Sequence, residues 1–363
     1  MRNLRVTFHT YAGEVKAIDG IDITVNKREL LGLVGESGCG KSVTALAIAG
    51  LLSENARVES GEVLLDGEEI LNLDEKELRH KRLTDLALVF QDPMTYLNPV
   101  MSIGTQLVEM FTHNLEFYRD ELIDFRLRQM ETEHDGESDS ELVAEKNRLS
   151  ALRKREGAKL GRREGKRLAE LRAMDYLRLV NLPDPERIMK MYPFELSGGM
   201  RQRAMIAMAL VRRPKLLLAD EITTALDVTV QAQVLELIKE LRDKIDSSII
   251  LITHDLGIVA QTCDRVAVMY AGNVVELSPV DVVFKNPLHP YTKGLLAAIP
   301  KLNSAVGSDL ESIKGSVPDL IHPPNGCRFH PRCPMAFEKC SNAKPPLIEA
   351  NSGHYVACFL YGG

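Results

Sequence analysis

The most constraining feature of this 363-residue chain is the glycine-rich octapeptide Gly35–Ser42, which reads GESGCGKS. It follows the apolar run Leu30–Val34 and is continued by an apolar segment with helical spacing, Ser42–Leu52. The octapeptide fits the pattern G-x-x-x-x-G-K-[ST], in which glycines allow backbone N–H groups to turn inward around phosphate oxygens. A strand, a phosphate loop and a helix in this order predict a nucleotide-binding α/β fold.

The chemistry of this loop predicts a role for its residues. Lys41 is expected to reach the β- and γ-phosphates, and the hydroxyl of Ser42 is expected to bind Mg²⁺. The helix that begins near Lys41 adds the positive end of its dipole. We interpret Cys39 as a small residue that fits the loop rather than as a redox thiol. The predicted nucleotide contacts are Gly35, Ser37, Gly38, Cys39, Gly40, Lys41, Ser42 and Val43.

A second apolar run, Leu216–Glu221, ends in two carboxylates. At the end of a buried strand, Asp220 is placed to hold Mg²⁺ through water, and Glu221 to act as general base toward the attacking water. A strand that ends in Asp-Glu is common by itself. Together with a phosphate loop, it predicts ATP hydrolysis.

The remaining pattern predicts an α/β core. Alternating apolar residues in Leu4–Val25 indicate paired strands at an antiparallel edge. The runs Lys215–Ala219 and Ser248–Ile252 are typical of strands buried on both faces of a parallel sheet. Helical stretches separate them, notably Gln202–Val211 and Val230–Ile245, and this alternation favours a mainly parallel sheet.

Composition excludes some classes of function. The net charge of −6 argues against nucleic acid as the partner, because phosphate backbones attract basic surfaces. No stretch approaches the roughly 20 apolar residues that span a bilayer, and the first thirty residues lack a secretory apolar core. The sequence therefore predicts a cytosolic protein, for which any membrane role would need another chain to supply the span.

Further motifs resemble those of ATP-binding-cassette (ABC) ATPases. Leu196–Arg203, which reads LSGGMRQR, is similar to their signature sequence. Gln91 resembles their Q-loop glutamine, Ala225–Asp227 their D-loop, and His254 their switch histidine. The order of the motifs along the chain also matches, and together they cover about residues 1–280.

The resemblance implies a composite ATP site. In this family two cassettes pair head to tail, and the signature of one closes over the ATP bound by the other. Ser197, Gly198 and Gly199 open a helix with a hydroxyl and exposed N–H groups, which suits an anion. Asp227 is expected to contact nucleotide from the D-loop. Tyr11 stands at the distance expected of the aromatic residue that stacks on adenine, with Phe8 or an ordinary surface role for Tyr11 as alternatives.

The resemblance also implies two further catalytic residues. His254 would contact the γ-phosphate and orient Glu221 and the water, and it follows a strand where open α/β sheets place their ligands. Gln91 would touch Mg²⁺ or the water. It would couple the site to a transmembrane partner through Asp92–Met101.

The tail narrows the resemblance to oligopeptide and dipeptide importer ATPases, with nickel importers sharing much of the region. Asn286–Lys293 (NPLHPYTK), Gly326–Pro334 (GCRFHPRCP) and Asp227–Gln231 (DVTVQ) are similar to that subfamily. Two features depart from it. Ile222 stands where the family usually has proline, and an insertion around Phe117–Glu170 is longer than expected.

The expected architecture is an ABC cassette of the P-loop NTPase class over residues 1–278. Its RecA-like core, with an antiparallel β edge, takes about residues 1–91 and 214–278, and a helical subdomain takes about 92–213. Within the latter, the charged insertion 113–172 is interpreted as a solvated helical hairpin, or alternatively as a contact surface for anionic lipid or a partner chain. Residues 279–363 are expected to form a small C-terminal metal-binding domain.

Four of the six cysteines crowd this tail, with the spacing C-x5-C-x6-C-x17-C: Cys327, Cys333, Cys340 and Cys358. Thiolates are soft ligands, so the spacing predicts a four-thiolate metal site, and the missing C-x-x-C pair weakens the zinc interpretation. The resemblance implies a [4Fe-4S] cluster. Zn²⁺ and metal-free cysteines, reduced or disulfide-bonded, remain alternatives, and His330 or His354 could substitute as ligands.

These features predict an ATPase subunit that drives uptake of di- or oligopeptides through separate permeases. Importers of nickel or another small solute, and soluble ABC ATPases, are the alternatives. A catalytically inactive scaffold conflicts with the presence of Lys41, Asp220, Glu221 and His254. The resemblance implies a second, paralogous ATPase subunit, two permeases and an extracellular binding protein, at the cytoplasmic face of the membrane.

Overall fold

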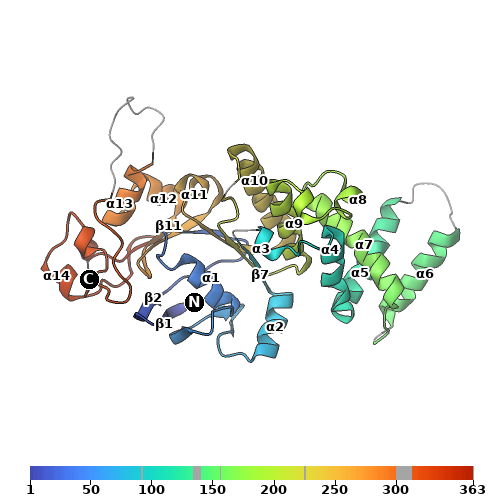
Figure 1. Ribbon diagram of the computed structural model, residues 1–363, viewed down its shortest axis with the longest axis horizontal. Coiled ribbons are helices and arrows are strands. Elements are labelled where there is room, and N and C mark those ends of the chain that lie inside the picture. The colour runs from blue at the N-terminus through green and yellow to red at the C-terminus, as the bar shows by residue number, and fades with distance from the viewer. Residues whose placement is uncertain (91–92, 134–139, 156, 225, 300–312, 363) are drawn as a thin grey trace. The chain divides into compact units, whose positions relative to one another are not determined.

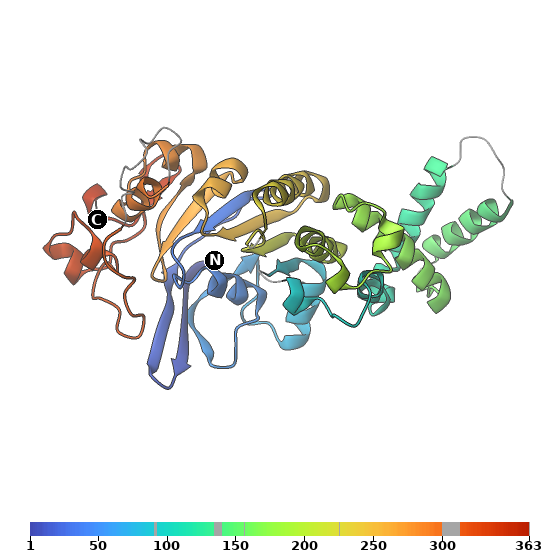
Figure 2. The same cartoon turned by 45° about the horizontal axis from the view of Figure 1, so that its top comes forward.

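The computed structural model describes residues 1–90, 93–133, 140–155, 157–224, 226–299 and 313–362 (Figures 1 and 2). The chain forms two compact units. The first comprises Met1–Gln91, Arg213–Thr224 and Ile238–Gly363, and the second comprises Asp92–Arg212 and Ala225–Leu237.

The first unit contains the strands and the helices that cover them. Its strands are β1 (Arg2–Thr10), β2 (Gly13–Ile21), β3 (Leu30–Val34), β4 (Ala56–Glu62), β5 (Leu64–Leu65), β6 (Glu68–Glu69), β7 (Leu86–Val89), β8 (Leu216–Asp220), β9 (Ser248–Thr253), β10 (Arg265–Tyr270), β11 (Asn273–Pro279), β12 (Ile348–Asn351) and β13 (His354–Val356). Its helices are α1 (Lys41–Ala49), α2 (Glu75–Thr84), α11 (Leu256–Thr262), α12 (Val280–Lys285), α13 (Pro290–Ala297) and α14 (Glu338–Asn342).

The central sheet has eight strands in the order β12-β13-β11-β10-β3-β9-β8-β7. The strands from β10 to β7 are parallel to their neighbours. All five residues of β3 are buried, as the apolar run Leu30–Val34 predicts for a strand covered on both faces. Because parallel strands end at the same edge, the residues that follow β3, β8 and β9 meet there.

The other side of this sheet is antiparallel and includes the C-terminal tail. β11 pairs with β10 and with β13, and β12 pairs with β13. Glu276 of β11 is fully buried, and its carboxylate accepts hydrogen bonds from the N–H groups of Leu288 and His289. His354 of β13, also fully buried, lies 2.7 Å from the same carboxylate. The tail therefore continues the central sheet and shares a buried polar centre with it.

A separate three-stranded sheet, ordered β2-β1-β4, forms the antiparallel edge that the alternation in Leu4–Val25 predicts. Leu4 and Val6 of β1 are fully buried and belong to the core beneath this sheet. Figure 2 shows β1 and β2 as a long blue hairpin. The short pair β5 and β6 forms a third sheet.

The second unit is helical. It contains α3 (Pro93–Tyr96), α4 (Ile103–Thr112), α5 (Leu115–Glu133), α6 (Ser140–Lys154), α7 (Arg162–Leu179), α8 (Pro185–Ile188), α9 (Gly198–Val211) and the first part of α10 (Val228–Ile245). Arg153 of α6 pairs with Asp120 and Asp124 of α5 at 3.1 and 2.8 Å, so opposite charges join these two helices of the insertion. None of the described helices combines the length and the apolar character that crossing a membrane requires.

Candidate nucleotide-binding and hydrolysis site

The phosphate loop connects the end of β3 to the start of α1, and its backbone explains two of its glycines. A Cβ atom on Gly35 would stand 2.2 Å from the carbonyl oxygen of Met269. This clash is with backbone, so a change of side-chain rotamer could not relieve it. Gly40 has a φ of 104°, a left-handed conformation that favours glycine, and a Cβ there would lie 2.8 Å from the Ala17 carbonyl oxygen. The backbone of the loop thus lies close against that of β10 and β2.

Lys41 is buried at the first position of α1. Its Nζ atom donates hydrogen bonds to the carbonyl oxygens of Gly35, at 2.8 Å, and Glu36, at 3.0 Å. The lysine therefore ties the loop together from inside and brings a positive charge to the N-terminal end of a helix. That combination is suited to a polyphosphate.

Asp220, at the end of β8, fits a cation site. Burial raises the pKa of its carboxyl group, while a hydrogen bond from Ser42 and the charge of Lys41 act in the opposite direction. Its Oδ1 atom is buried and has no hydrogen-bond partner among the described residues. A buried carboxylate oxygen without a partner is costly unless a cation neutralises it, so Asp220 and Ser42 suit Mg²⁺. Gln91, the third predicted Mg²⁺ contact, lies outside the described residues.

Glu221 follows Asp220 with a φ of 48°, in the left-handed region that few side chains adopt. Its N–H donates to the carbonyl oxygen of Ile252 at 2.9 Å, and this bond fixes the backbone at the sheet edge. The carboxylate accepts a hydrogen bond from the Thr224 hydroxyl at 3.4 Å and lies 3.3 Å from Nδ1 of His254. The structure thus brings together the predicted general base and the predicted switch histidine. The strained backbone of Glu221 is of the kind that clusters at functional sites.

In the second unit, Ser197 caps α9, and its Oγ atom accepts a hydrogen bond from the N–H of Met200 at 3.4 Å. A Cβ atom on Gly199 would stand 2.3 Å from Cγ1 of Val230, so this glycine lets α9 approach α10. Asp227 accepts a hydrogen bond from the Val230 N–H at 2.9 Å. The signature motif is therefore a capped helix start, and backbone N–H groups at such a start are of the kind that bind anions. Gly198 is part of this first turn. Ala225 of the D-loop lies outside the described residues.

Tyr11 lies in the turn between β1 and β2, and its side chain is fully exposed. Phe8, the alternative adenine-stacking residue, is partly buried and packs against the core. An exposed ring has a free face for stacking, so the adenine contact of Tyr11 stays a prediction that its placement permits.

The four tail cysteines line one small cavity of about 10 Å³, together with Phe329, His330 and Met335. All the cysteines are free thiols. Burial raises the pKa of Cys327 to about 11, and the charges of Cys340, Cys333 and Cys358 raise it as well. These surroundings thus favour the neutral thiol of Cys327.

The predicted metal site is not formed as a set of converging ligands. Among the described residues, no three His, Cys, Asp or Glu side chains are arranged to hold one metal ion. The expected [4Fe-4S] cluster, the zinc alternative and the metal-binding character of the tail therefore all lack support from the geometry of the described residues. His354 does not line the cysteine cavity, and its Nε2 lies 2.7 Å from the carboxylate of Glu276. His330 does line the cavity, and its Nδ1 lies 2.9 Å from the carbonyl oxygen of Cys327.

Sequence reasoning missed two tail residues, Arg332 and Tyr291, that hold the phosphate loop. The carboxylate of Glu36, inside the loop, pairs with Arg332, and the N–H of Glu36 donates to the hydroxyl of Tyr291. The partners are separated by 296 and 255 positions in the sequence. Both lie in the motifs GCRFHPRCP and NPLHPYTK, whose only sequence signal was their likeness to a family.

Comparison with known proteins shows which family the chain resembles over nearly its whole length. Residues 18–224 match the family described as "ABC transporter", and residues 275–340 match "Oligopeptide/dipeptide transporter, C-terminal region". The chain is 45% identical over 359 residues to the oligopeptide transport ATP-binding protein OppD of Salmonella typhimurium, covering 99% of this chain and 92% of that protein. It is 42% identical over 361 residues to the dipeptide transport ATP-binding protein DppD of Bacillus subtilis, covering 99% and 93%.

Among solved structures, a dimeric ATP-binding cassette in a post-hydrolysis state with ADP and Pi matches with a TM-score of 0.55 and 23% identity, covering 77% of this chain and 97% of that chain. The cassette cbiO1 from Clostridium perfringens matches with a TM-score of 0.55 and 24% identity, covering 78% and 91%. At these identities the likeness shows the fold alone, which is that of an ATP-binding cassette.

Proposed function

We propose that this chain, which belongs to the ABC transporter family and to its oligopeptide and dipeptide branch, is the ATP-hydrolysing subunit of a peptide importer. It couples the binding and hydrolysis of ATP to the uptake of di- or oligopeptides through separate transmembrane permeases. The observation that carries hydrolysis is the hydrogen-bonded pair of Glu221 and His254, which follow the ends of β8 and β9, together with the unpartnered Oδ1 atom of Asp220. An inactive scaffold would have no use for that arrangement.

The residues at the sheet edge divide the reaction between them. Lys41 binds the phosphates, and Ser42 and Asp220 would hold Mg²⁺, which when bound neutralises the charge of the phosphate oxygens. Glu221 accepts a proton from the attacking water while the water oxygen bonds to the γ-phosphorus, and the bond from that phosphorus to the β–γ bridging oxygen breaks, with ADP as the leaving group. His254, 3.3 Å from the Glu221 carboxylate, orients this base.

The assembly follows from the second anion-binding helix start. The first turn of α9 completes the ATP site of a second cassette, and the D-loop residue Asp227 lies at the same interface. We infer that the second cassette is a paralogue, that two permeases dock on the pair, and that an extracellular binding protein delivers the peptide. The chain then works at the cytoplasmic face of the membrane, with Gln91 and the segment Asp92–Met101 relaying the state of the ATP site to the permease.

Affinity purification from native membranes tests this assignment. The tagged chain is expected to bring down two multi-span permeases and a second cassette, and ATP hydrolysis in the purified complex should rise with added peptide and binding protein. Recovery of the chain without permeases would favour a soluble ABC ATPase. Stimulation by nickel, and not by peptide, would favour the metal-importer alternative.

The four-cysteine cavity supports a more specific proposal, a [4Fe-4S] cluster in the tail. A single ion needs ligands that converge on one point, whereas the four thiolates around such a cluster each bind a different iron atom. Four thiols that line one cavity match this ligand pattern, and the cavity of about 10 Å³ would have to open to admit the cluster. The cluster would pin a proline-rich segment, and no role in electron transfer follows from it.

Protein purified without oxygen is expected to be brown and to contain about four iron atoms per chain. Cys333→Ser should abolish the colour and lower the iron content to background, whereas Cys263→Ser should leave both unchanged, because Cys263 packs against Gly32 of β3. Stoichiometric zinc without iron, or colourless protein with four reactive thiols in the tail, would refute the cluster.

A further inference from the structure

The turn between Cys327 and Cys333 carries two arginines, Arg328 and Arg332, whose side chains are each only 6% exposed. Neither side chain lines the cysteine cavity, and both contact residues of the cassette, Arg328 at Ala271 and Arg332 at Glu36. Buried arginines need a full set of acceptors, so their partners show what this turn is bound to.

Arg332 is bonded to the phosphate loop. Its Nη1 and Nη2 atoms lie 2.7 and 3.1 Å from the two carboxylate oxygens of Glu36, in a bidentate pair. Nη1 also donates to the Tyr270 hydroxyl at 3.3 Å, and Nε donates to the Lys314 carbonyl oxygen at 3.1 Å. The bond to Glu36 raises the pKa of the guanidinium, which is charged in any case. A two-pronged pair fixes the orientation of both groups, which a single contact does not.

Glu36 is consequently held at three points. Arg332 binds its carboxylate, the Tyr291 hydroxyl accepts a hydrogen bond from its N–H at 2.9 Å, and Nζ of Lys41 donates to its carbonyl oxygen at 3.0 Å. The first two partners come from the tail and the third is the phosphate-binding lysine. The position of Lys41 therefore depends on a peptide unit that the tail holds.

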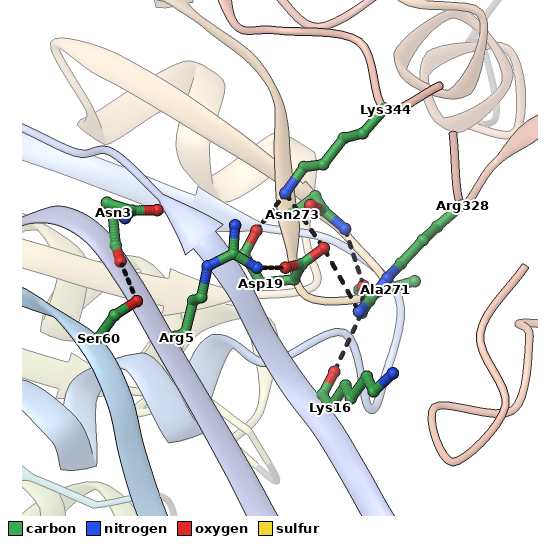
Figure 3. A network of polar contacts seen from close by, with 9 residues as sticks. All are labelled: Asn3, Arg5, Lys16, Asp19, Ser60, Ala271, Asn273, Arg328 and Lys344. Carbon is green, nitrogen blue, oxygen red and sulfur yellow. Dashed lines mark hydrogen bonds and ion pairs between the residues drawn. The ribbon is translucent and has the colours of Figure 1, made fainter. Parts of the chain in front are cut away.

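Arg328 anchors the same turn on its other side (Figure 3). Its Nη1 donates to the carbonyl oxygens of Lys16, at 3.0 Å, and Ala271, at 2.6 Å, and its Nη2 lies 3.5 Å from Asp19. The next residue after Ala271, Gly272, donates its N–H to the carbonyl oxygen of Cys39 at 2.9 Å. The turn that carries Arg332 is thus anchored by Arg328 to β2 and to the residues after β10.

We propose that Arg332 is a positioning residue for the phosphate loop, and that through it the cysteine-lined turn of the tail sets the ATP affinity of the cassette. Without the pair, the loop around Glu36 samples more conformations before ATP binds, and ordering it then weakens binding. Arg332 contacts the loop through the side chain of Glu36, a residue to which we assign no contact with phosphate, Mg²⁺ or the attacking water. Its removal should therefore act on ATP binding and leave the chemical step unchanged.

The test compares Arg332→Ala with the wild type in the purified transporter complex, using a fluorescent ATP analogue for Kd and steady-state hydrolysis for KM and kcat. We expect Kd and KM to rise about tenfold, the effect of losing one well-formed bidentate charge pair, with kcat at saturating ATP unchanged. Arg332→Lys, which keeps the charge and loses the fork, should fall between the two. Lys339→Ala is the matched control, because this cation covers a ring of the tail itself, that of Phe359, at 4.6 Å.

Glu36→Gln keeps the tail and its arginine intact, so it answers the objection that Arg332→Ala merely unfolds the tail. It should raise Kd as much as Arg332→Ala does, and the double variant should be no weaker than either single one. Wild-type Kd in Glu36→Gln, or additive effects in the double variant, would overturn the proposal. So would a fall in kcat at unchanged KM. The readout is nucleotide affinity, so it does not depend on the identity of the imported solute or on a cluster in the tail.

Discussion

Replacing Glu221 with glutamine is expected to slow ATP hydrolysis by about 10²- to 10⁴-fold, the usual contribution of a positioned general base, and to leave ATP affinity nearly unchanged. Glutamine has the size of glutamate but cannot take a proton from water. The backbone bond from Glu221 N–H to Ile252 does not involve the side chain, so the left-handed turn should persist. The site would bind Mg-ATP and stop before the chemical step.

The measurement is single-turnover hydrolysis at saturating Mg-ATP, with the Kd of the same variant as the second readout. Glu75→Gln, at an exposed position on α2, is the control for loss of one carboxylate. If the cassettes pair as proposed, Glu221→Gln should also accumulate with ATP as a closed dimer that size-exclusion chromatography resolves. Turnover at the wild-type rate would mean that another group is the base.

The parts of the site that lie at strand ends could be predicted because burial on both faces leaves a clear apolar run. Leu30–Val34 is β3 with the predicted bounds, and the runs predicted at Lys215–Ala219 and Ser248–Ile252 are β8 and β9, displaced by a residue at most. Parallel pairing of such strands is enough to bring Lys41, Asp220 and His254 to one edge. Here the apolar runs predict the strands, and the motifs that follow the runs predict the same sheet edge as the site.

The tail could not be predicted in this way, because its structure depends on contacts between distant polar groups. Nothing in the sequence near His354 indicates that its ring is buried against Glu276, 78 positions away. Its place near the cysteines in the sequence indicates a possible metal ligand. In the structure its ring and the Glu276 carboxylate are both buried, and a buried polar group is costly unless it is hydrogen-bonded. The bond of Arg332 to Glu36 escaped prediction for the same reason.

Replacing Lys41 with alanine should affect an earlier step than the glutamate variant does, namely binding. Charge-assisted hydrogen bonds contribute about 1.5–3 kcal/mol each, so losing the lysine contacts to the phosphates should weaken ATP affinity by about a hundredfold or more. The variant also loses the bonds from Nζ to the carbonyl oxygens of Gly35 and Glu36, so the empty loop should become less ordered.

The clearest measurement uses Lys41→Ala combined with Glu221→Gln, because the bound nucleotide is then not consumed. In Glu221→Gln alone, Mg-ATP at about 100 times its Kd should stabilise the protein by about 2.7 kcal/mol, seen as a rise in Tm. The double variant should show almost no rise at the same concentration. Lys76→Ala on α2 is the matched control and should keep the full rise, since Lys76 stands outside the phosphate loop. A full rise in the Lys41 variant would show that the backbone N–H groups and the helix dipole suffice for binding, and that the lysine acts only in the chemical step.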